Sequence, residues 1–491
     1  MTKQNILSRA AVLLMMVFTM TVPTAWADWS GVGKGTVSEP YQITSYAQLK
    51  EFATIVNDGN TSACAILTTD IACTYNTDGD YDAPIGNGTK PYAGTFNGQG
   101  YAITHLRVSE VSGGIGFFGV IKGATVKNVI LDFPKVSSTG TVVPTQLGAL
   151  IGLGDSGDNT TNTVENCLVI SPTLTINQSS NISLGAIIGT IYGTTTVTNC
   201  FYCASDTYKP IGNDNAGTRN NISRAYQITE TQESMPSLKA DDKVVFRRSF
   251  TKDVASTVCL PFGIDATQVA VDGKFYTFAG VDKTGEKWEV IMQEADPKAN
   301  PPVAGNEAST LTANTPYLFM PAATGPVLFF GEAADVSSAG TTEDAEGWTF
   351  KGTYNKRVWD GKNNAAEIGH VYGFAAQSYA GGTYNVSPGD FVMAAEGASI
   401  EPFRAYLEYN SGGQSNGTKR RNTPAETGPL PTRMAVRLVG ADGIVTGIGG
   451  LTPDPSPVGE GSWFTLDGRK LNSAPNACGL YIHHGQKVIK K

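Results

Sequence analysis

Two hydrophobic patterns alternate along the N-terminal half of the chain. A glycine-framed apolar turn in residues 113–119 returns in residues 147–152 and 184–189, and each turn is followed by a short strand of the form Thr-Val-x-Asn. From Gly119 to Gly152 is 33 residues, and from Gly152 to Gly189 is 37. A period of this length predicts a solenoid whose stacked coils each contribute the same short strands.

In the Thr-Val-x-Asn strands, the alternation of inward- and outward-facing positions shifts by one residue at the asparagine. This change of parity predicts a corner. The inward-facing valine stands two residues before the asparagine, and the apolar positions after the asparagine have the opposite parity. Asparagine tolerates the left-handed backbone that a tight bend needs. Coils that stack about 4.8 Å apart then place three asparagines in a hydrogen-bonded ladder. These are Asn128, Asn166 and Asn199.

The same register predicts where two cysteines lie. Cys167 and Cys200 directly follow two of the ladder asparagines, so we expect them on successive coils. This position is compatible with two buried free thiols, and also with a disulfide if the Cβ directions permit one. The chain has seven cysteines, which leaves at least one of them unpaired.

The rest of the pattern predicts one helix and a second β domain. Residues 45–57 begin with a capping-box serine and glutamine and carry one apolar face, so this helix would cover the open end of the solenoid. From residue 241, about ten longer strands separated by turns predict a β-sandwich. The predicted fold class is all-β: a β-helix with a capping helix, a β-sandwich and a small C-terminal β-unit.

These patterns divide the chain into six segments. Residues 1–27 have Lys3 and Arg9 ahead of an apolar run and a small-x-small end, which is typical of a secretory signal peptide. Their apolar core is well short of the roughly 20 residues that span a bilayer. The other segments are the β-helix (28–225), a linker (226–240), the β-sandwich (241–410), a flexible Gly-, Pro- and Ser-rich linker (411–461) and a strand-forming tail (462–491).

Charge and composition argue against nucleic acid as a partner. Charged residues make up 16% of the chain and glycines number 56, which favours short strands and many turns. The formal net charge is −8, and it falls to −10 without Lys3 and Arg9 because residues 1–27 contain no acidic residue. An acidic chain binds the phosphate backbone poorly.

An acidic loop in residues 76–82 is the candidate metal site. Its carboxylates stand at alternate positions, Asp78, Asp80 and Asp82. Such carboxylates can converge on calcium, which prefers oxygen ligands. The loop does not have the glycine and glutamate spacing of an EF-hand. It is therefore either a calcium site or a solvated turn between strands, and no other cofactor is expected.

Catalytic motifs are not evident in the sequence. Residues 114–119 match G-x-G-x-x-G, but the β-branched run that follows provides no helix N-terminus for a pyrophosphate. Carbohydrate-active β-helices cluster carboxylates on one sheet, whereas the repeat strands offer Lys127 and Glu165, with Asp132 nearby. No nucleophile pattern accompanies any of the four histidines, His105, His370, His483 and His484. We expect no catalysis.

Residues 92–103, Tyr-Ala-Gly-Thr-Phe-Asn-Gly-Gln-Gly-Tyr-Ala-Ile, resemble the GLUG motif of secreted adhesin-like proteins of the Bacteroides and Prevotella group. The usual wording is close to G-T-F-D-G-Q-G-H-x-I, so Asn97 and Tyr101 replace the usual Asp and His, and Gly116-Phe-Phe-Gly119 replaces G-L-F-G. The resemblance covers residues 31–213 and implies a right-handed parallel β-helix.

Two further resemblances lie downstream. Val258-Cys-Leu-Pro-Phe262, Thr315-Pro-Tyr-Leu-Phe319 and Pro402-Phe-Arg-Ala-Tyr406 lie in the second half of the chain. Through them residues 244–409 resemble a module common in the same secreted proteins, which implies no particular activity. The tail resembles the C-terminal tails of Bacteroidetes exported proteins, some of which direct type IX secretion. The alternative for the tail is a small strand unit with no sorting role.

Together these features predict a secreted or cell-surface, adhesin-like protein that is not an enzyme. Faces rich in backbone, Thr, Asn and Tyr suit glycans or other extracellular polymers. Two alternatives remain open: a polysaccharide lyase or glycoside hydrolase on the β-helix, and a structural component of the cell envelope. We expect no nucleic-acid partner and no transmembrane span.

Overall fold

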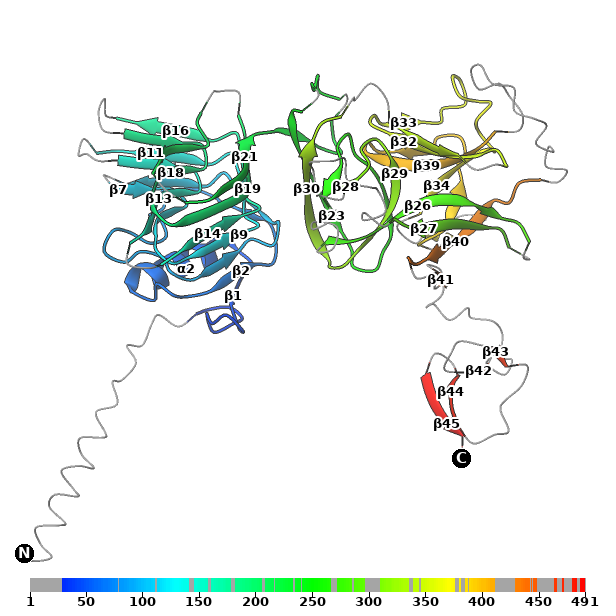
Figure 1. Ribbon diagram of the computed structural model, residues 1–491, viewed down its shortest axis with the longest axis horizontal. Coiled ribbons are helices and arrows are strands. Elements are labelled where there is room, and N and C mark those ends of the chain that lie inside the picture. The colour runs from blue at the N-terminus through cyan, green and yellow to red at the C-terminus, as the bar shows by residue number, and fades with distance from the viewer. Residues whose placement is uncertain are drawn as a thin grey trace, which may run out of the picture. The chain divides into compact units, whose positions relative to one another are not determined.

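The computed structural model is all-β, with one helix and 45 strands among the residues that it describes (Figure 1). The chain forms two compact units. The first comprises Met1–Gln227, Asp242–Ser249 and Gly325–Phe330, and the second comprises Ile228–Asp241, Phe250–Thr324 and Gly331–Lys491. The described residues are 29–77, 79–110, 113–140, 145–157, 160–177, 182–204, 208–215, 217–232, 235–239, 241–265, 272–284, 287–295, 310–334, 339–343, 346–375, 379–380, 385–386, 388–410, 429–441, 443, 445–447, 463–465, 470–471, 479–483 and 486–490.

The first unit is a parallel β-helix, in which the strands of successive coils pair in register. The largest sheet contains β1 (Tyr41–Ile43), β2 (Ala65–Leu67), β4 (Thr95–Asn97), β9 (Thr125–Lys127), β14 (Asn162–Glu165), β19 (Thr195–Cys203), β21 (Arg219–Arg224), β15 (Leu168–Ile170), β10 (Ile130–Asp132), β5 (Ala102–Thr104) and β3 (Ile71–Ala72). The long strand β19 joins the two halves of this sheet, because its first part pairs with β14 and its second part with β15.

Three smaller sheets complete each coil. The first has β6 (Arg107–Glu110), β11 (Lys135–Ser138) and β16 (Thr173–Ile176). The second has β7 (Gly113–Ile115), β12 (Thr145–Gly148) and β17 (Ile182–Gly185). The third has β8 (Phe118–Ile121), β13 (Ile151–Ser156), β18 (Ile188–Gly193) and β20 (Ile211–Asp214). The predicted solenoid of repeated coils is thus the architecture of this unit.

Identical positions of successive coils fill the core of the β-helix. Phe96 pairs with Val126, Val126 with Val164, and Val164 with Val197, and all four side chains are completely buried. Burial of such a side chain contributes about 1.5–3 kcal/mol. The Thr-Val-x-Asn repeat is therefore a repeat of inward-facing apolar positions.

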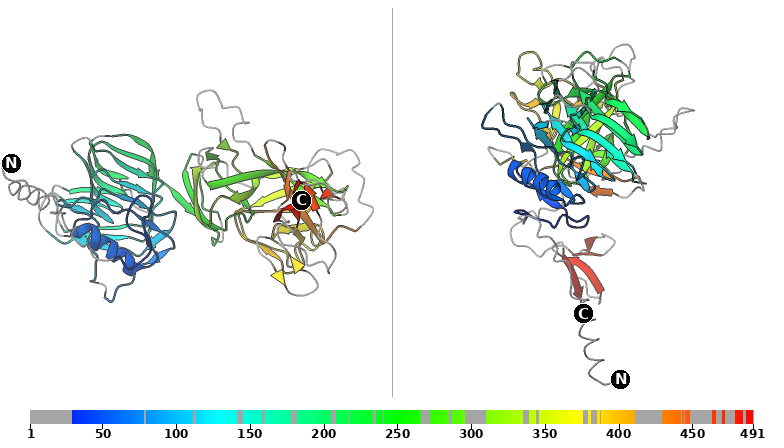
Figure 2. Two further views of the ribbon diagram at one scale, coloured as in Figure 1. Left: turned by 90° about the horizontal axis from the view of Figure 1, so that it is seen from below. Right: turned by 90° about the vertical axis from the view of Figure 1, so that its left-hand side faces the viewer.

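Helix α2 (Tyr46–Asp58) packs against the first coils at the N-terminal end (Figure 2). Its buried face, Leu49, Phe52, Ile55 and Val56, belongs to the β-helix core, and the ring of Phe52 contacts those of Tyr92 and Phe96. Ser45 caps the helix by accepting a hydrogen bond from the Gln48 amide. The Gln48 side chain accepts from Thr44 instead of closing the box on Ser45.

The β-helix also carries an apolar stripe on its outer surface, which two strands from later in the chain cover. Val245 of β23 (Lys243–Phe250), together with Leu328 and Phe330 of β30 (Gly325–Glu332), packs on this stripe. Its residues are Ala102, Ile130, Leu168, Ile170 and Phe201. The two strands form a sheet with β22 (Tyr226–Ile228). Parts of the predicted linker 226–240 and the predicted sandwich 241–410 therefore belong to the first unit.

The second unit is built around one sheet that folds over a single core. Its order is β24 (Ser256–Cys259), β29 (Pro316–Pro321), β26 (Gly273–Asp282), β27 (Glu289–Glu294), β40 (Arg433–Val439), β37 (Phe391–Met393), β34 (Val371–Phe374), β39 (Arg404–Tyr409), β32 (Trp348–Thr353) and β31 (Thr341–Glu343), with β41 (Val445–Gly447) beside β40. The Cys259 amide of β24 donates to the Phe403 carbonyl just before β39, so distant parts of the sheet approach each other. Side chains from both layers meet in one core, as in a β-sandwich or near-barrel.

Three two-stranded ribbons and a terminal sheet complete the description. The ribbons are β25 (Ile264–Asp265) with β28 (Thr310–Leu311), β33 (Arg357–Val358) with β38 (Ser399–Ile400), and β35 (Tyr379–Ala380) with β36 (Asn385–Val386). The C-terminal β-unit has the order β43 (Lys470–Leu471), β42 (Trp463–Thr465), β44 (Gly479–His483) and β45 (Gln486–Lys490).

Strand β40 corrects the predicted flexible linker over residues 411–461. It lies between β27 and β37 in the large sheet, and it pairs in parallel with β27. Met434, Val436 and Leu438 are buried in the core and alternate with less buried positions, two of which are arginines. This alternation is the pattern of a half-buried strand, and the surrounding glycines and prolines obscured it.

Candidate binding surface on the β-helix

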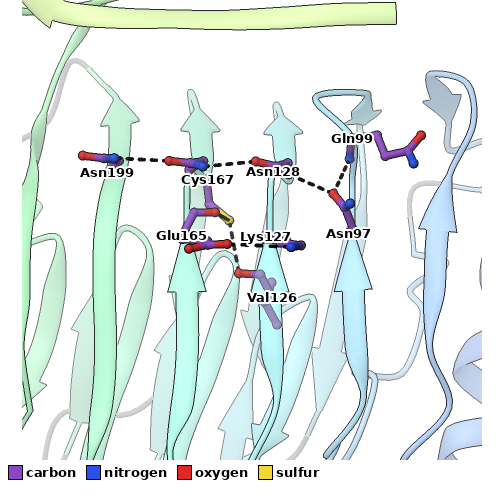
Figure 3. A network of polar contacts seen from close by, with 9 residues as sticks. Asn97, Gln99, Val126, Lys127, Asn128, Glu165, Cys167 and Asn199 are labelled. Carbon is purple, nitrogen blue, oxygen red and sulfur yellow. Dashed lines mark hydrogen bonds and ion pairs between the residues drawn. The ribbon is translucent and has the colours of Figure 1, made fainter. Parts of the chain in front are cut away.

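The asparagines of the first corner form a continuous row of side-chain hydrogen bonds (Figure 3). The Asn166 amide nitrogen donates to Asn128 Oδ1 at 3.3 Å, and the Asn199 amide nitrogen donates to Asn166 Oδ1 at 3.3 Å. All three have the left-handed backbone of a tight bend, with φ of 54°, 53° and 50°. The strain of this conformation is compensated by hydrogen bonds that each asparagine makes with both neighbours.

Two further asparagines extend the row beyond the repeats. Asn128 donates to Asn97 Oδ1 at 2.9 Å, and Asn221 donates to Asn199 Oδ1 at 2.9 Å. Asn97 stands one position earlier in its strand than the others, and its side chain also accepts from the Gln99 amide. Asn221 lies only 22 residues after Asn199. Neither residue has the Thr-Val-x-Asn signature, which is why the sequence pattern missed them.

Cys167 and Cys200 occupy equivalent places on neighbouring coils, directly after the corner. The residues that follow them, Leu168 and Phe201, are register partners. Both thiols are completely buried and free, and each contacts backbone carbonyls of the corner. Burial, with a contribution from Cys200, raises the pKa of the Cys167 thiol well above its ordinary value. Of the two alternatives, the structure contains the free thiols.

The acidic loop uses its described carboxylates for hydrogen bonds within the protein. Asp80 accepts hydrogen bonds from the Thr77 hydroxyl and from the backbone amides of Thr77 and Asn76. These hydrogen bonds lower the pKa of Asp80. Asp82 accepts from the hydroxyls of Tyr46 and Tyr75, at 2.7 Å and 3.0 Å. Asp78 lies outside the described residues. Within the described part of the chain, no group of three or more His, Cys, Asp or Glu side chains could hold a metal ion.

The carboxylates of the repeat strands do not face one another. Glu165 lies 3.9 Å from the ammonium of Lys127 on the neighbouring strand (Figure 3). Asp132 is partly buried, and this burial raises its pKa, although His105 and Arg247 act in the opposite direction. An acid pair of the kind that glycosidases use requires two carboxyl groups across one bond of the substrate. Glu165 is instead paired with Lys127, and Asp132 is partly buried.

A second corner of the β-helix has the same left-handed backbone conformation as the first corner but different side chains. His105, Phe133 and Ser171 have φ of 58°, 52° and 47°, and their amides bond to the next coil at equivalent positions. The Phe133 side chain is 53% exposed, and its ring stacks on that of His105 with centroids 5.8 Å apart and an interplanar angle of 13°. A bulky side chain in the left-handed region is a true outlier. No sequence pattern had marked this residue.

Basic and aromatic side chains continue this surface beyond the second corner. Arg107, Lys135 and Thr173 are register neighbours on β6, β11 and β16, and each alternates with a more buried apolar residue. The Lys135 ammonium lies 5.5 Å from the ring centroid of Tyr81, and the Arg107 guanidinium lies 4.9 Å from that of Tyr75. We call this the aromatic surface: His105, Phe133, Lys135, Arg107, Tyr75 and Tyr81.

The sheet beside the asparagine row presents a different column. Thr95, Thr125, Thr163 and Thr196 are register neighbours on β4, β9, β14 and β19, and all four are half-buried. The next outward column contains Asn97, Lys127, Glu165 and Thr198. This face is polar and its charges compensate each other.

Comparison with known proteins found one partial match. No family model and no solved structure matches the chain. A protein of Evansella cellulosilytica described as a "Gly-rich membrane protein" is 30% identical over 122 residues, which are 24% of this chain and 14% of that protein. The match therefore covers about a seventh of that protein's length. Among the described residues of the present chain, no helix has the length and apolarity needed to cross a membrane.

Proposed function

We propose that this chain is a non-catalytic, secreted or cell-surface protein whose β-helix binds a carbohydrate polymer. The observation that carries the proposal is Phe133, which is 53% exposed in a left-handed conformation. Folding gains little from this arrangement. An aromatic face on a rigid scaffold is, however, a suitable platform for the apolar face of a sugar ring.

The strain at Phe133 is the reason to look for a function there. A left-handed conformation costs a residue other than glycine about 1–2 kcal/mol, and glycine or asparagine would avoid most of that cost. Strained residues concentrate at binding sites, because the surrounding structure holds them in place. Here the backbone amide of Phe133 donates to the Ile170 carbonyl of the next coil, which holds the backbone that carries the ring.

The carboxylates support a binding role over a catalytic one. Glu165 faces Lys127, and Asp82 already accepts two tyrosine hydroxyls. The extracellular location rests on the signal-like pattern of residues 1–27 and on the resemblance to GLUG-motif proteins. From the separate resemblance of residues 462–491 to the C-terminal tails of Bacteroidetes exported proteins, we propose that this tail directs export or anchoring.

A glycan-array experiment with the full chain tests the proposal. We expect binding to one or more oligosaccharides, and loss of that binding in Phe133→Gly, which removes the ring and relieves the backbone. Tyr192→Ala is the matched control, because Tyr192 is also an exposed aromatic residue (45%) but lies on β18. Its binding should equal that of the unmodified protein.

Two results would overturn the proposal. Release of new reducing ends or unsaturated sugars from a bound polysaccharide would identify a hydrolase or lyase. Absence of binding to every glycan, with no product, would favour a structural component of the cell envelope.

A further inference from the structure

We infer that the polymer bound at the aromatic surface is an anionic polysaccharide, whose carboxylate or sulfate groups bind Lys135 while a sugar ring stacks on Phe133. This inference rests on the proposed function and specifies the chemistry of its ligand. It is carried by the arrangement of charges on β6 and β11.

Arg107 and Lys135 are direct neighbours in the register of the sheet, so two cations lie on adjacent strands about 4.8 Å apart. Like charges in directly opposed positions destabilise a sheet. The equivalent outward positions of β9 and β14 hold Lys127 and Glu165, which are oppositely charged and lie 3.9 Å apart. On β9 and β14 the cation therefore faces an acid, whereas on β6 and β11 two cations are register neighbours.

Arg107 has partners of its own, among them the Thr77 carbonyl and the Tyr75 ring. Asp80 lies close enough for Arg107 to help lower its pKa. Asp82 is held by two tyrosine hydroxyls, and Asp132 interacts with His105 and Arg247. Glu110, at the end of β6, has a partner of its own. Within the described residues, Lys135 has the ring of Tyr81 as its neighbour and no carboxylate within ion-pair distance.

This arrangement is unusual for a chain with a formal net charge of −8. Tyr81 positions the Lys135 ammonium through a cation–π contact while leaving its hydrogens available to an acceptor. A carboxylate or sulfate would form a charge-assisted hydrogen bond there. Phe133 lies at the corner, two residues before Lys135, which is the first residue of β11, so one saccharide can reach both groups. A neutral glycan would use the ring but leave the cation without a partner.

Titration calorimetry with three probes tests the inference on the full chain: an oligogalacturonate, a heparin-derived oligosaccharide and a neutral galacto-oligosaccharide of equal length. We expect an acidic probe to bind at least about tenfold more tightly than the neutral one, and to weaken as salt increases. Comparison of the first two probes distinguishes a carboxylate from a sulfate ligand.

Substitutions separate the charge from the ring. Lys135→Gln should weaken binding of the acidic probe by roughly tenfold to a hundredfold and leave the neutral probe unaffected. Lys127→Gln, which removes a cation from β9 in a different sheet of the β-helix, should change neither. Thermal unfolding of both variants verifies that they are folded.

The failures of the two proposals are distinguishable. Equal affinity for acidic and neutral probes, with no effect of Lys135→Gln, would overturn the anionic ligand but leave carbohydrate binding at Phe133 in place. Binding that Phe133→Gly does not affect, or no binding of any probe, would overturn both.

Discussion

The two corners of the β-helix both bend through residues with a left-handed backbone, but they use different side chains. Asn128, Asn166 and Asn199 have φ near 50°, and so do His105, Phe133 and Ser171. The asparagines are linked by amide hydrogen bonds from coil to coil. The second corner has one ring stack and exposed side chains. The backbone strain is therefore compensated at the first corner and left largely uncompensated at the second.

This difference separates residues that build the β-helix from residues that it presents. A corner that needs only to bend can use one residue type in every coil, and its side chains can bond to one another. A corner that binds a ligand needs different side chains in successive coils. Each corner also adjoins a group whose ionisation is opposed by burial, Cys167 after Asn166 and Asp132 before Phe133. The following predictions test the contrast.

Asn166→Ala should have the largest effect, a loss of about 2–4 kcal/mol in the stability of the β-helix. The substitution removes two hydrogen bonds and leaves Asn128 Oδ1 and the Asn199 side-chain amide without these partners. It also keeps the left-handed backbone of residue 166 but removes the side-chain hydrogen bonds that compensate its strain. Hydrogen-exchange mass spectrometry should show faster exchange in peptides covering β9, β14 and β19. Peptides covering β27 and β40 in the second unit serve as the internal control.

Asn166→Gly distinguishes the hydrogen bonds from the backbone. Glycine adopts the left-handed conformation freely, so this variant should recover about 1 kcal/mol of the loss in Asn166→Ala. If both variants exchange at the rate of the unmodified protein, the asparagine row does not stabilise the first corner.

Alkaline pH should weaken the first corner next. Because burial raises the folded-state pKa of Cys167, the thiol contributes its full stability below the unfolded pKa of about 8.5 and loses it as pH rises toward the folded pKa. The loss is at most about 1.4 kcal/mol per pH unit for one thiol. Scanning calorimetry between pH 8 and 10 should show a fall in the midpoint temperature of the first unit's unfolding transition. That transition is identified as the one whose midpoint shifts in Asn166→Ala.

Cys167→Ala should reduce that pH dependence, since it removes the ionising group. Cys259→Ala is the control, because burial also raises the pKa of this thiol, in its case to about 12, but Cys259 lies in the second unit. If the midpoint temperature of the first unit depends on pH in Cys167→Ala as it does in the unmodified protein, this thiol does not ionise on unfolding between pH 8 and 10.

Phe133→Gly should have a smaller effect and the opposite sign at the second corner. Relief of the left-handed strain should stabilise the β-helix by up to about 1 kcal/mol, less the stacking on His105. Phe133→Ala, which loses the ring but keeps the strain, should be no more stable than the unmodified protein. Destabilisation by Phe133→Gly of more than 1 kcal/mol would show that the ring supports folding, contrary to the proposed role.

The sequence predicted the first corner because its signals are local. The Thr-Val-x-Asn repeat and the change of parity lie within a few residues, and together they locate Asn166 and its neighbours. Asn97 and Asn221 were missed because they join the row only through three-dimensional stacking. Phe133 was missed for another reason: nothing in its immediate sequence distinguishes an exposed phenylalanine from a core residue. Its alignment with Ser171, each five residues after a ladder asparagine, was the available signal.

The downstream strands show a second limit of sequence reasoning. Val129, Ile130 and Leu131 are apolar in succession, which is typical of a strand buried on both faces. That run indicates that something covers the outer face of β10, but it does not identify β23 and β30. Contacts between residues so far apart depend on the folded chain, whereas the alternating Met434, Val436 and Leu438 of β40 could have been recognised from their period.

Asp132→Asn should have the smallest effect, a modest stabilisation at pH 7. Desolvation is the largest cause of the raised Asp132 pKa and outweighs the attraction of His105 and Arg247, so holding the ionised carboxylate in the fold is unfavourable. A group with a raised folded pKa contributes its full stability below its unfolded pKa, about 3.9 for Asp, and loses it as pH rises through the folded value. The advantage of the amide should therefore be present at pH 7 and absent at pH 3, as measured by the calorimetric midpoint of the first unit. If Asp132→Asn is instead less stable at pH 7, the attraction to Arg247 exceeds the cost of burial, and the second corner is held by charge as firmly as the first is held by amides.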